Sequence, residues 1–308
     1  MKKMLALLLA LTMVFALVAC SSNETEAPAT DADTADTTET VETPEATDDT
    51  SDDTSADAGE TTGDDAAAED GAAAGAAEFT TVEEGKLIMS TNAAFPPYEM
   101  TDDQDQVIGI DADIAAAIAD KLGLELQIDN MDFDAALLDV QQGRSDIVMA
   151  GVTVNEDRLA VMDFTDSYAT GVQVVIVPEG SDITLDDLGD LMIGTQRATT
   201  GNILASYPPE DGGFGEDHVI AYDNGITAVQ ALLNGQVDCV IIDDGPAREF
   251  VAANPGLEIL PTEWVTEEYA IGLAKGNTAL LDAVNGALNE LIDDGTVQSI
   301  IDSYISAE

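Results

Sequence analysis

Short apolar segments alternate with amphipathic segments from residue 86 onward, and this alternation restricts the folds open to the chain. The first expected strands occupy residues 86–90, 124–128 and 147–150. Between them, apolar residues recur at helical spacing from Asp111, which we expect to cap the helix, to Gly123, and again over 134–142. Strands that alternate with helices form parallel βαβ units, so the pattern predicts an α/β fold with ligands bound beyond the carboxyl ends of the strands.

The alternation continues in the second half of the chain. The expected strands there occupy residues 171–177, 192–194, 237–242, 257–260 and 269–274. The expected helices occupy residues 182–188, 202–207, 227–233, 278–293 and 297–303. A loop of small and hydroxyl residues, 195–201, precedes one of these helices, and such a loop offers free backbone N–H groups to an anion.

The N-terminus has the pattern of a secretory signal. Two lysines precede an apolar run, 4–19, that is too short for a membrane span but typical of a signal-peptide core. The run ends in Leu-Val-Ala-Cys, which resembles the lipobox of bacterial lipoproteins. We therefore expect a signal peptide at 1–19 and a diacylglycerol anchor on Cys20. An ordinary cleaved signal followed by an accidental cysteine is the alternative.

Residues 20–80 combine this cysteine with a long acidic segment of Asp, Glu, Thr and Ala. The segment contains too few large apolar residues to offset the entropy lost on ordering. We predict a disordered acidic tether between the anchor and the folded part.

The charge balance limits the partners of the folded part. Nine Lys+Arg face 62 Asp+Glu, for a formal net charge of −53. Such a chain is repelled by nucleic acid and by anionic lipid surfaces, so neither is expected to bind it.

No cofactor or metal is expected. The acidic run 102–105 does not match a calcium loop, because Val107 and Ile108 stand where ligands are required, and the run is read as the turn of a hairpin over 98–110. The lone His218 cannot form a metal site by itself. Cys239 lies in an apolar run and is expected to be buried, with a disulfide to Cys20 as the alternative.

The stretch 146–168 carries the clearest sign of a binding site. It is expected to form a buried strand, a small-residue turn at 151–153 and a short helix that begins near Asn155 and carries Arg158. Backbone donors and a guanidinium would then meet, which favours a carboxylate ligand. The alternative is that Arg158 pairs with a neighbouring aspartate, Asp157 or Asp163, on a solvated face.

Several motifs in sequence resemble a known family. They are FPPYE, GIDADIAAAIADKLGLEL, FDAALLDVQQGRSDIVMAGVTVNEDRLAVMDFTDSY, IGTQRATTG, VDCVIIDDGPA and EEYAIGLAKGN. Their order is similar to that in the amino-acid-binding proteins of ABC importers, the bacterial extracellular solute-binding family 3. The resemblance implies the type II periplasmic-binding-protein-like fold, with two α/β lobes, two hinge-crossing strands and a ligand cleft between the lobes. Lobe 1 would comprise 81–171 and 267–308, and lobe 2 would comprise 172–266.

The resemblance also implies a set of ligand-binding residues. Arg158 would hold the ligand α-carboxylate with help from Gly151, Thr153, Thr199 and Thr200, and Asp243 would hold the α-ammonium group. Phe95 and Phe133 would form aromatic walls, and Asn92 and Gln196 would contact the ligand side chain. The residues alone leave open that both phenylalanines belong to the core and that Asp243 caps a helix.

The expected function follows from this resemblance. The protein would be a monomeric receptor on the outer face of the cell membrane that captures a free polar or basic L-amino acid and delivers it to an ABC permease. The sequence lacks GxSxG, a P-loop and a metal-ligand cluster, so we do not expect an enzyme. A sensor subunit for a separate signalling partner and a dehydratase-like enzyme on the same fold are the alternatives.

Overall fold

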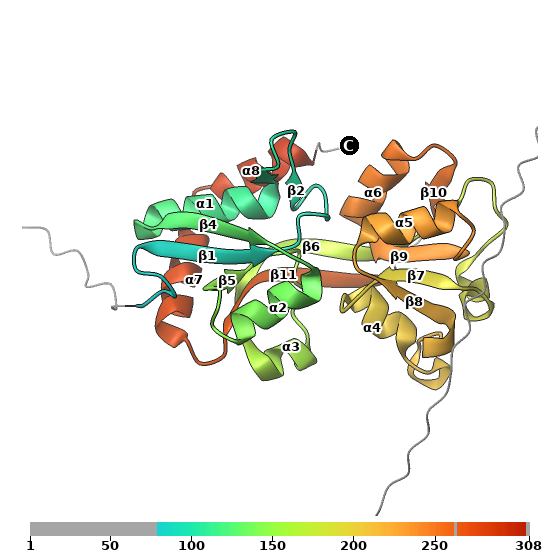
Figure 1. Ribbon diagram of the computed structural model, residues 1–308, viewed down its shortest axis with the longest axis horizontal. Helices are drawn as coiled ribbons and strands as arrows, with labels where there is room; N and C mark the ends of the chain where they lie inside the picture. Colours follow the sequence, from blue (N-terminus) through green and yellow to red (C-terminus); the bar gives the residue numbers. More distant parts are fainter. Residues whose placement is uncertain (1–78, 262–263, 306–308) are drawn as a thin grey trace, which may run out of the picture. The chain divides into compact units, whose positions relative to one another are not determined.

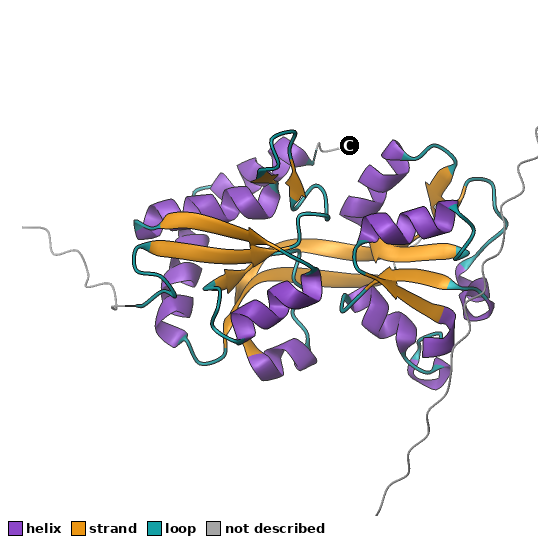
Figure 2. Cartoon of the chain, viewed as in Figure 1, coloured by secondary structure: helices purple, strands orange, loops and turns teal. Residues whose placement is uncertain are grey.

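The computed structural model describes residues 79–261 and 264–305. All of them belong to one compact unit of the chain, Glu69–Glu308. A twisted sheet is covered by helices, which confirms the predicted α/β class, and two lobes are joined by long strands (Figure 1, Figure 2). Within the described ranges, no helix has both the length and the apolar character needed to cross a bilayer. The predicted signal peptide, Cys20 and nearly all of the predicted tether lie outside the described residues.

The main sheet has nine strands in the order β4-β1-β5-β11-β6-β9-β7-β8, with β10 beside β6. Its strands are β1 Lys86–Thr91, β4 Glu125–Asn130, β5 Ile147–Val148, β6 Met162–Pro178, β7 Ile193–Gln196, β8 Val219–Tyr222, β9 Cys239–Asp243, β10 Leu257–Ile259 and β11 Val265–Ala274. Strands β4, β1 and β5 are parallel to one another, and so are β9, β7 and β8. Each lobe thus contains one set of parallel strands. A separate hairpin of β2 (Met100–Thr101) and β3 (Val107–Ile108) has the predicted acidic turn between its strands.

Two antiparallel strands, β6 and β11, run through both lobes. They pair from Val265 opposite Gln173 to Ala274 opposite Met162. One end of β11 also pairs with β5 of lobe 1, and the opposite end of β6 pairs with β9 of lobe 2. These are the two crossing strands that the fold class requires. The proposed lobe boundaries, 171/172 and 266/267, fall inside them and remain a prediction.

The predicted strand 171–177 was too short, because β6 begins nine residues earlier, at Met162. Residues 162–170 are held in the strand by pairing with β11, about 100 residues away in the chain. Local sequence periodicity does not reveal such a distant partner.

Eight α-helices and three 3-10 helices cover the sheet in the described residues. The α-helices are α1 Ile110–Leu122, α2 Phe133–Gln141, α3 Glu156–Val161, α4 Thr200–Ser206, α5 Gly225–Leu233, α6 Asp244–Ala253, α7 Thr278–Asp293 and α8 Thr296–Tyr304. The 3-10 helices are η1 Leu185–Asp190, η2 Pro209–Asp211 and η3 Glu216–His218. Helix α1 packs against α7 and α8, and its isoleucines Ile110, Ile114 and Ile118 are completely buried. Each such side chain contributes about 1.5–3 kcal/mol to folding through the hydrophobic effect.

The prediction that Asp111 caps α1 is wrong. Gly109 occupies the N-cap position. A side chain does not fit there, because a Cβ would lie 2.2 Å from the carbonyl oxygen of Tyr98. Asp111 lies inside the helix and is completely buried. Its carboxylate accepts hydrogen bonds from the Gly151 N–H at 3.0 Å and from the Tyr168 hydroxyl at 2.7 Å. Asp111 therefore holds a loop of the central sheet instead of a helix terminus.

Three further local predictions can be compared with the structure. The segment predicted as a helix over 182–188 forms the 3-10 helix η1 with a capping box between Thr184 and Asp187. His218 is half-buried, and its Nδ1 lies 3.1 Å from the carbonyl oxygen of Leu191. Cys239 is completely buried, as predicted.

Candidate functional site

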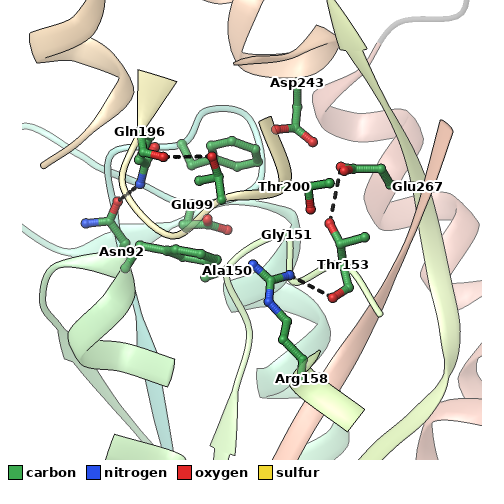
Figure 3. Close-up of a pocket in the computed structure, with 13 residues that line it drawn as sticks. Asn92, Glu99, Ala150, Gly151, Thr153, Arg158, Gln196, Thr200, Asp243 and Glu267 are labelled. Atoms are coloured by element: carbon green, nitrogen blue, oxygen red, sulfur yellow. Dashed lines mark hydrogen bonds between the residues drawn. The ribbon is translucent and has the colours of Figure 1, made fainter. Parts of the chain in front are cut away.

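A pocket lies between the two lobes (Figure 3). It is lined by Asn92, Phe95, Glu99, Phe133, Ala150, Gly151, Thr153, Arg158, Gln196, Thr199, Thr200, Asp243 and Glu267. All ten ligand-binding residues expected from the sequence are among them. Their convergence is thus observed, whereas their contact with a ligand remains a prediction.

The parallel strands explain why residues so distant in sequence meet here. Asn92 follows β1, Gly151 follows β5, and Gln196 and Asp243 are the last residues of β7 and β9. The carboxyl ends of parallel strands in each lobe face the space between the lobes, which is where open α/β sheets bind ligands.

Arg158 is held at the lobe 1 side of the pocket with only 6% of its surface exposed. Its backbone N–H is capped by the side chain of Asn155 at the start of α3. Its guanidinium donates to the carbonyl oxygens of Thr153 at 2.7 Å and Ala198 at 3.1 Å, and lies 5.4 Å from the centre of the Phe133 ring. Burial lowers the pKa of Arg158 to about 10, opposed by the nearby charges of acidic residues. A guanidinium has five N–H donors, so several remain for a ligand.

The alternative pairing of Arg158 with a neighbouring aspartate is not seen. Asp163 instead forms an ion pair with Lys275 at 2.6 Å. Among the described residues, neither Asp163 nor Asp157 forms an ion pair with Arg158. The guanidinium therefore faces the pocket without a carboxylate bound directly to it, which is the state expected of a site that receives an external carboxylate.

Two donors expected to assist Arg158 are already engaged. The Gly151 N–H is donated to Asp111, and the Thr153 hydroxyl is donated to Glu267 at 3.2 Å. Both residues line the pocket, but these two donors already form hydrogen bonds with side chains of the protein itself. The sequence predicts the position of these groups correctly and cannot reveal their partners.

The two threonines of lobe 2, Thr199 and Thr200, differ in whether their hydroxyls already have hydrogen-bond partners. The Thr199 hydroxyl donates to the Gln196 carbonyl oxygen at 2.8 Å and caps α4 by accepting from the Asn202 N–H. The Thr200 hydroxyl is buried and has no hydrogen-bond partner in the described chain. Thr200 is therefore the hydroxyl available to a ligand.

Asn92 and Gln196 contact each other across the lobes. The Gln196 side-chain amide donates to the Asn92 side-chain oxygen Oδ1 at 3.1 Å, and the Asn92 side-chain amide donates to the backbone carbonyl oxygen of Met131 at 2.8 Å. Together with the Arg158–Ala198 bond, this contact joins the two lobes at the pocket. The side-chain oxygen Oε1 of Gln196 is buried without a partner among the described residues, so it is the free acceptor of this pair.

Asp243 is 4% exposed and occupies the N-cap position of α6. Its side chain makes no capping hydrogen bond, and its Oδ1 accepts a hydrogen bond from the Tyr269 hydroxyl. Burial and the nearby charge of Glu267 hold the pKa of Asp243 well above its usual range. A buried carboxyl with this preference for a proton is also prepared to bind a cation.

The two aromatic residues are both buried, as core residues would be, and both line the pocket. The Phe95 ring packs beside Tyr98, with ring centres 5.9 Å apart, and over Gly151, where a Cβ would clash with it. Phe133 packs against the Arg158 guanidinium. The aromatic residues therefore support the site as well as enclosing it.

Glu99 lines the pocket, and the sequence left its role open, as a possible contact of a polar or cationic ligand side chain. It is completely buried, and neither carboxyl oxygen has a hydrogen-bond donor in the described part of the chain. Burial first, and then the adjacent Asp111 carboxyl, raise the pKa of Glu99 well above its usual value. The only signal for Glu99 in the sequence was its place directly after the rigid Phe-Pro-Pro-Tyr loop.

Glu267 is a pocket residue that the site prediction omitted. It is 3% exposed on β11, and it accepts hydrogen bonds from Thr153 and from the Gln173 side chain at 3.1 Å. Its two-residue spacing from Tyr269 places both on one face of the strand, a signal that could have been used. With Glu99 and Asp243, the pocket contains three carboxyl groups and one guanidinium.

A two-lobed α/β chain with a polar pocket between its lobes is the architecture of the periplasmic amino-acid-binding proteins. Residues 87–307 match the model of the bacterial extracellular solute-binding proteins, family 3, and the chain belongs to this family. Known members of this kind are solute-binding proteins of ABC transporters that act outside the cytoplasm, not enzymes.

Three relatives illustrate the similarity. A probable histidine-binding protein of Neisseria gonorrhoeae is 30% identical over 71% of this chain and 83% of its own length. The ABC transporter arginine-binding protein 1 of Escherichia coli is 29% identical over 71% of this chain and 90% of its own. The solved structure of the arginine-, lysine-, histidine-binding protein of Geobacillus stearothermophilus is 30% identical, with a TM-score of 0.67 over 72% of this chain and 96% of its own.

Proposed function

We propose that the protein is a lipid-anchored receptor that captures a free amino acid with a cationic or polar side chain and delivers it to an ABC permease. The observation that carries the proposal is the placement of Arg158 and Asp243. Both are at least nine-tenths buried, one is a guanidinium and the other a carboxyl, and they come from different lobes of the same pocket.

An amino acid matches this arrangement because it bears a carboxylate and an ammonium group on one carbon. Arg158 would bind the carboxylate together with Thr200, and Asp243 would bind the ammonium. Figure 3 shows Arg158 and Asp243 approaching the pocket from opposite sides. A ligand that contacts both lobes stabilises the closed form by the free energy of the contacts that the open form lacks.

The charge of the pocket favours a cationic side chain. Arg158 and Asp243 would balance the two charges of the amino-acid backbone. Glu99 is a further buried carboxyl that lies beside the Asp111 carboxyl and receives no hydrogen bond from an N–H or hydroxyl group of the described residues. A guanidinium, ammonium or imidazolium group of the ligand would pair with the Glu99 carboxylate, whereas a ligand carboxylate would be repelled. Histidine and arginine are the ligands in the names of the relatives described above.

Isothermal titration calorimetry of the purified protein with the twenty amino acids tests the proposal. We expect arginine, lysine or histidine to bind with micromolar affinity or tighter, about −8 kcal/mol or more. We expect aspartate and glutamate to give no binding. The absence of binding by all twenty would overturn the proposed function.

The anchor is tested separately. Cells that express the chain are labelled with a fatty-acid analogue, and the label is expected on the wild type and to be absent from Cys20→Ala. Equal labelling of both would exclude lipidation at Cys20 without affecting the ligand proposal.

A further inference from the structure

Glu267 has one carboxyl oxygen that the protein itself does not use. Oε2 accepts from Thr153 and from Gln173, and these two bonds fix the orientation of the group. Oε1 is buried and has no hydrogen-bond partner in the described part of the chain. Figure 3 shows the carboxyl of Glu267 directed toward the pocket, on the same side as Asp243. A buried acceptor left without a donor is destabilising, and more so when it is charged, so this oxygen is available to an external donor.

The strand pairing brings Glu267 and Asp243 together. On β6, Gln173 lies opposite Asp243 of β9, and Gly171 lies opposite Glu267 of β11. Because Gly171 has no side chain, the Tyr269 ring can pass over β6 and reach Asp243 with its hydroxyl; a Cβ at 171 would lie 2.1 Å from that oxygen. Three adjacent strands thus hold two carboxyl groups beside one another at the pocket.

Two buried carboxyls at close range do not both ionise in an apolar setting unless a cation joins them. In agreement, burial and the charge of Glu267 keep the pKa of Asp243 well above its usual range. The described residues supply no ion pair to either carboxyl: Arg158 directs its observed hydrogen bonds to the carbonyl oxygens of Thr153 and Ala198. A proton held by the carboxyl pair prevents two adjacent negative charges, and a cationic group of the ligand could take the place of that proton.

We propose that Glu267 is a second acceptor for the α-ammonium group of the ligand, placed beside Asp243. An ammonium has three N–H donors, and the two carboxyls offer it acceptors from two different elements, β9 and β11. This inference rests on the proposed function, since it requires an amino acid as the ligand. It assigns ammonium recognition to a crossing strand as well as to lobe 2.

The test uses two ligands that differ only in the group concerned. L-arginine carries the α-ammonium group, and 5-guanidinopentanoic acid lacks it while keeping the carboxylate and the guanidinium. Glu267→Gln removes the charge and preserves the shape of the side chain. Glu268→Gln, at the adjacent exposed position of the same strand, is the matched control.

We expect Glu267→Gln to weaken binding of L-arginine at least tenfold and to change binding of 5-guanidinopentanoic acid less than twofold. The control variant is expected to bind both ligands as the wild type does. Displacement titration extends the measurement to weak binding, and circular dichroism melting shows that each variant is folded.

Two results would overturn the assignment of Glu267. An equal loss for both ligands would mean that Glu267 supports Arg158 or the fold, and no loss for either would mean that the ligand does not contact it. A wild type that binds no amino acid would instead overturn the proposed function, so the two failures are distinguishable.

Discussion

The two ends of the pocket are built differently. The end near Arg158, Asp243 and Glu267 contains charges of both signs and is supported by the crossing strands. To the other end we assign Glu99, a buried carboxyl without a hydrogen-bond donor among the described residues, and the amide pair of Asn92 and Gln196. Under our proposal, the first end binds the part common to all amino acids and the second end selects the side chain. The following experiments separate the two.

The largest effect is expected at the common end. Arg158→Ala should weaken binding of every amino acid that the wild type binds, by about 2–5 kcal/mol, because a buried ligand carboxylate would lose its charged partner. This corresponds to roughly 30-fold to several-thousand-fold in Kd. Calorimetry with L-arginine and with one neutral amino acid measures it.

Arg144→Ala is the control for this variant, because Arg144 is an exposed arginine that contacts Asp139 and Gln142 far from the pocket lining. A loss limited to cationic ligands in Arg158→Ala would place this residue at the selective end and contradict the comparison.

Glu99→Gln should affect the selective end alone. We expect binding of L-arginine to fall by about tenfold or more, since a ligand cation would be buried without a counter-charge, while binding of glutamine stays the same or improves. Glu125→Gln, at an exposed position of β4, is the control. Equal effects on arginine and glutamine would show that Glu99 does not read the side chain.

Asp111 joins the two ends, because it holds the Gly151 N–H and lies beside Glu99. Burial raises its pKa from 3.8 to about 6. The folded state therefore binds this proton more tightly than the unfolded state does. The contribution of the protonated carboxyl to stability is complete below the pKa of the unfolded chain and is lost as the pH rises through the folded-state pKa of about 6. Relative to Asp111→Asn, the free energy of unfolding of the wild type should therefore fall between pH 4 and pH 7.5, by about 3 kcal/mol at 1.36 kcal/mol per pH unit.

Urea unfolding at the two pH values measures this difference. Asp120→Asn, at an exposed position on the same helix, should show a far smaller dependence on pH. A difference between wild type and Asp111→Asn that stays constant with pH would contradict the assignment.

The smallest effect is expected outside the pocket. Arg197 of lobe 2 forms an ion pair with Asp223 of its own lobe at 2.8 Å and lies 3.9 Å from Asp134 of lobe 1. These groups are about half exposed or more, and pairs of this kind contribute little. Arg197→Ala should weaken binding at most about fivefold, equally for all ligands and less at high salt.

Asp134→Asn should reproduce this effect if the contact between lobes matters, whereas Asp223→Asn should not. A larger loss for one class of ligand in Arg197→Ala would show that Arg197, although outside the pocket lining, also discriminates between ligand side chains.

The residues of the pocket were predictable from the sequence to an unusual extent for a physical reason. Asn92, Gly151, Gln196 and Asp243 each follow or end an apolar strand, and parallel strands bring such positions to one edge. The resemblance of the motifs to the solute-binding family then selected these residues and led us to predict Arg158 as the carboxylate anchor. Asp111 was misread as a helix cap because Asp near a helix start has that role when it is exposed, and its burial depends on Tyr168 and Gly151, which are distant in the chain.

The sequence by itself determined the class of fold, the family and the positions around the pocket, because these depend on local periodicity and on motifs. Only the tertiary structure decided which polar groups are free. Gly151 and Thr153 donate to Asp111 and Glu267, 40 and 114 residues away. The Thr200 hydroxyl, the Glu99 carboxyl and one oxygen of Glu267 have no hydrogen-bond partner among the described residues. Hydrogen-bond partners across the sheet depend on how the strands pair, and strand pairing is a property of the folded chain.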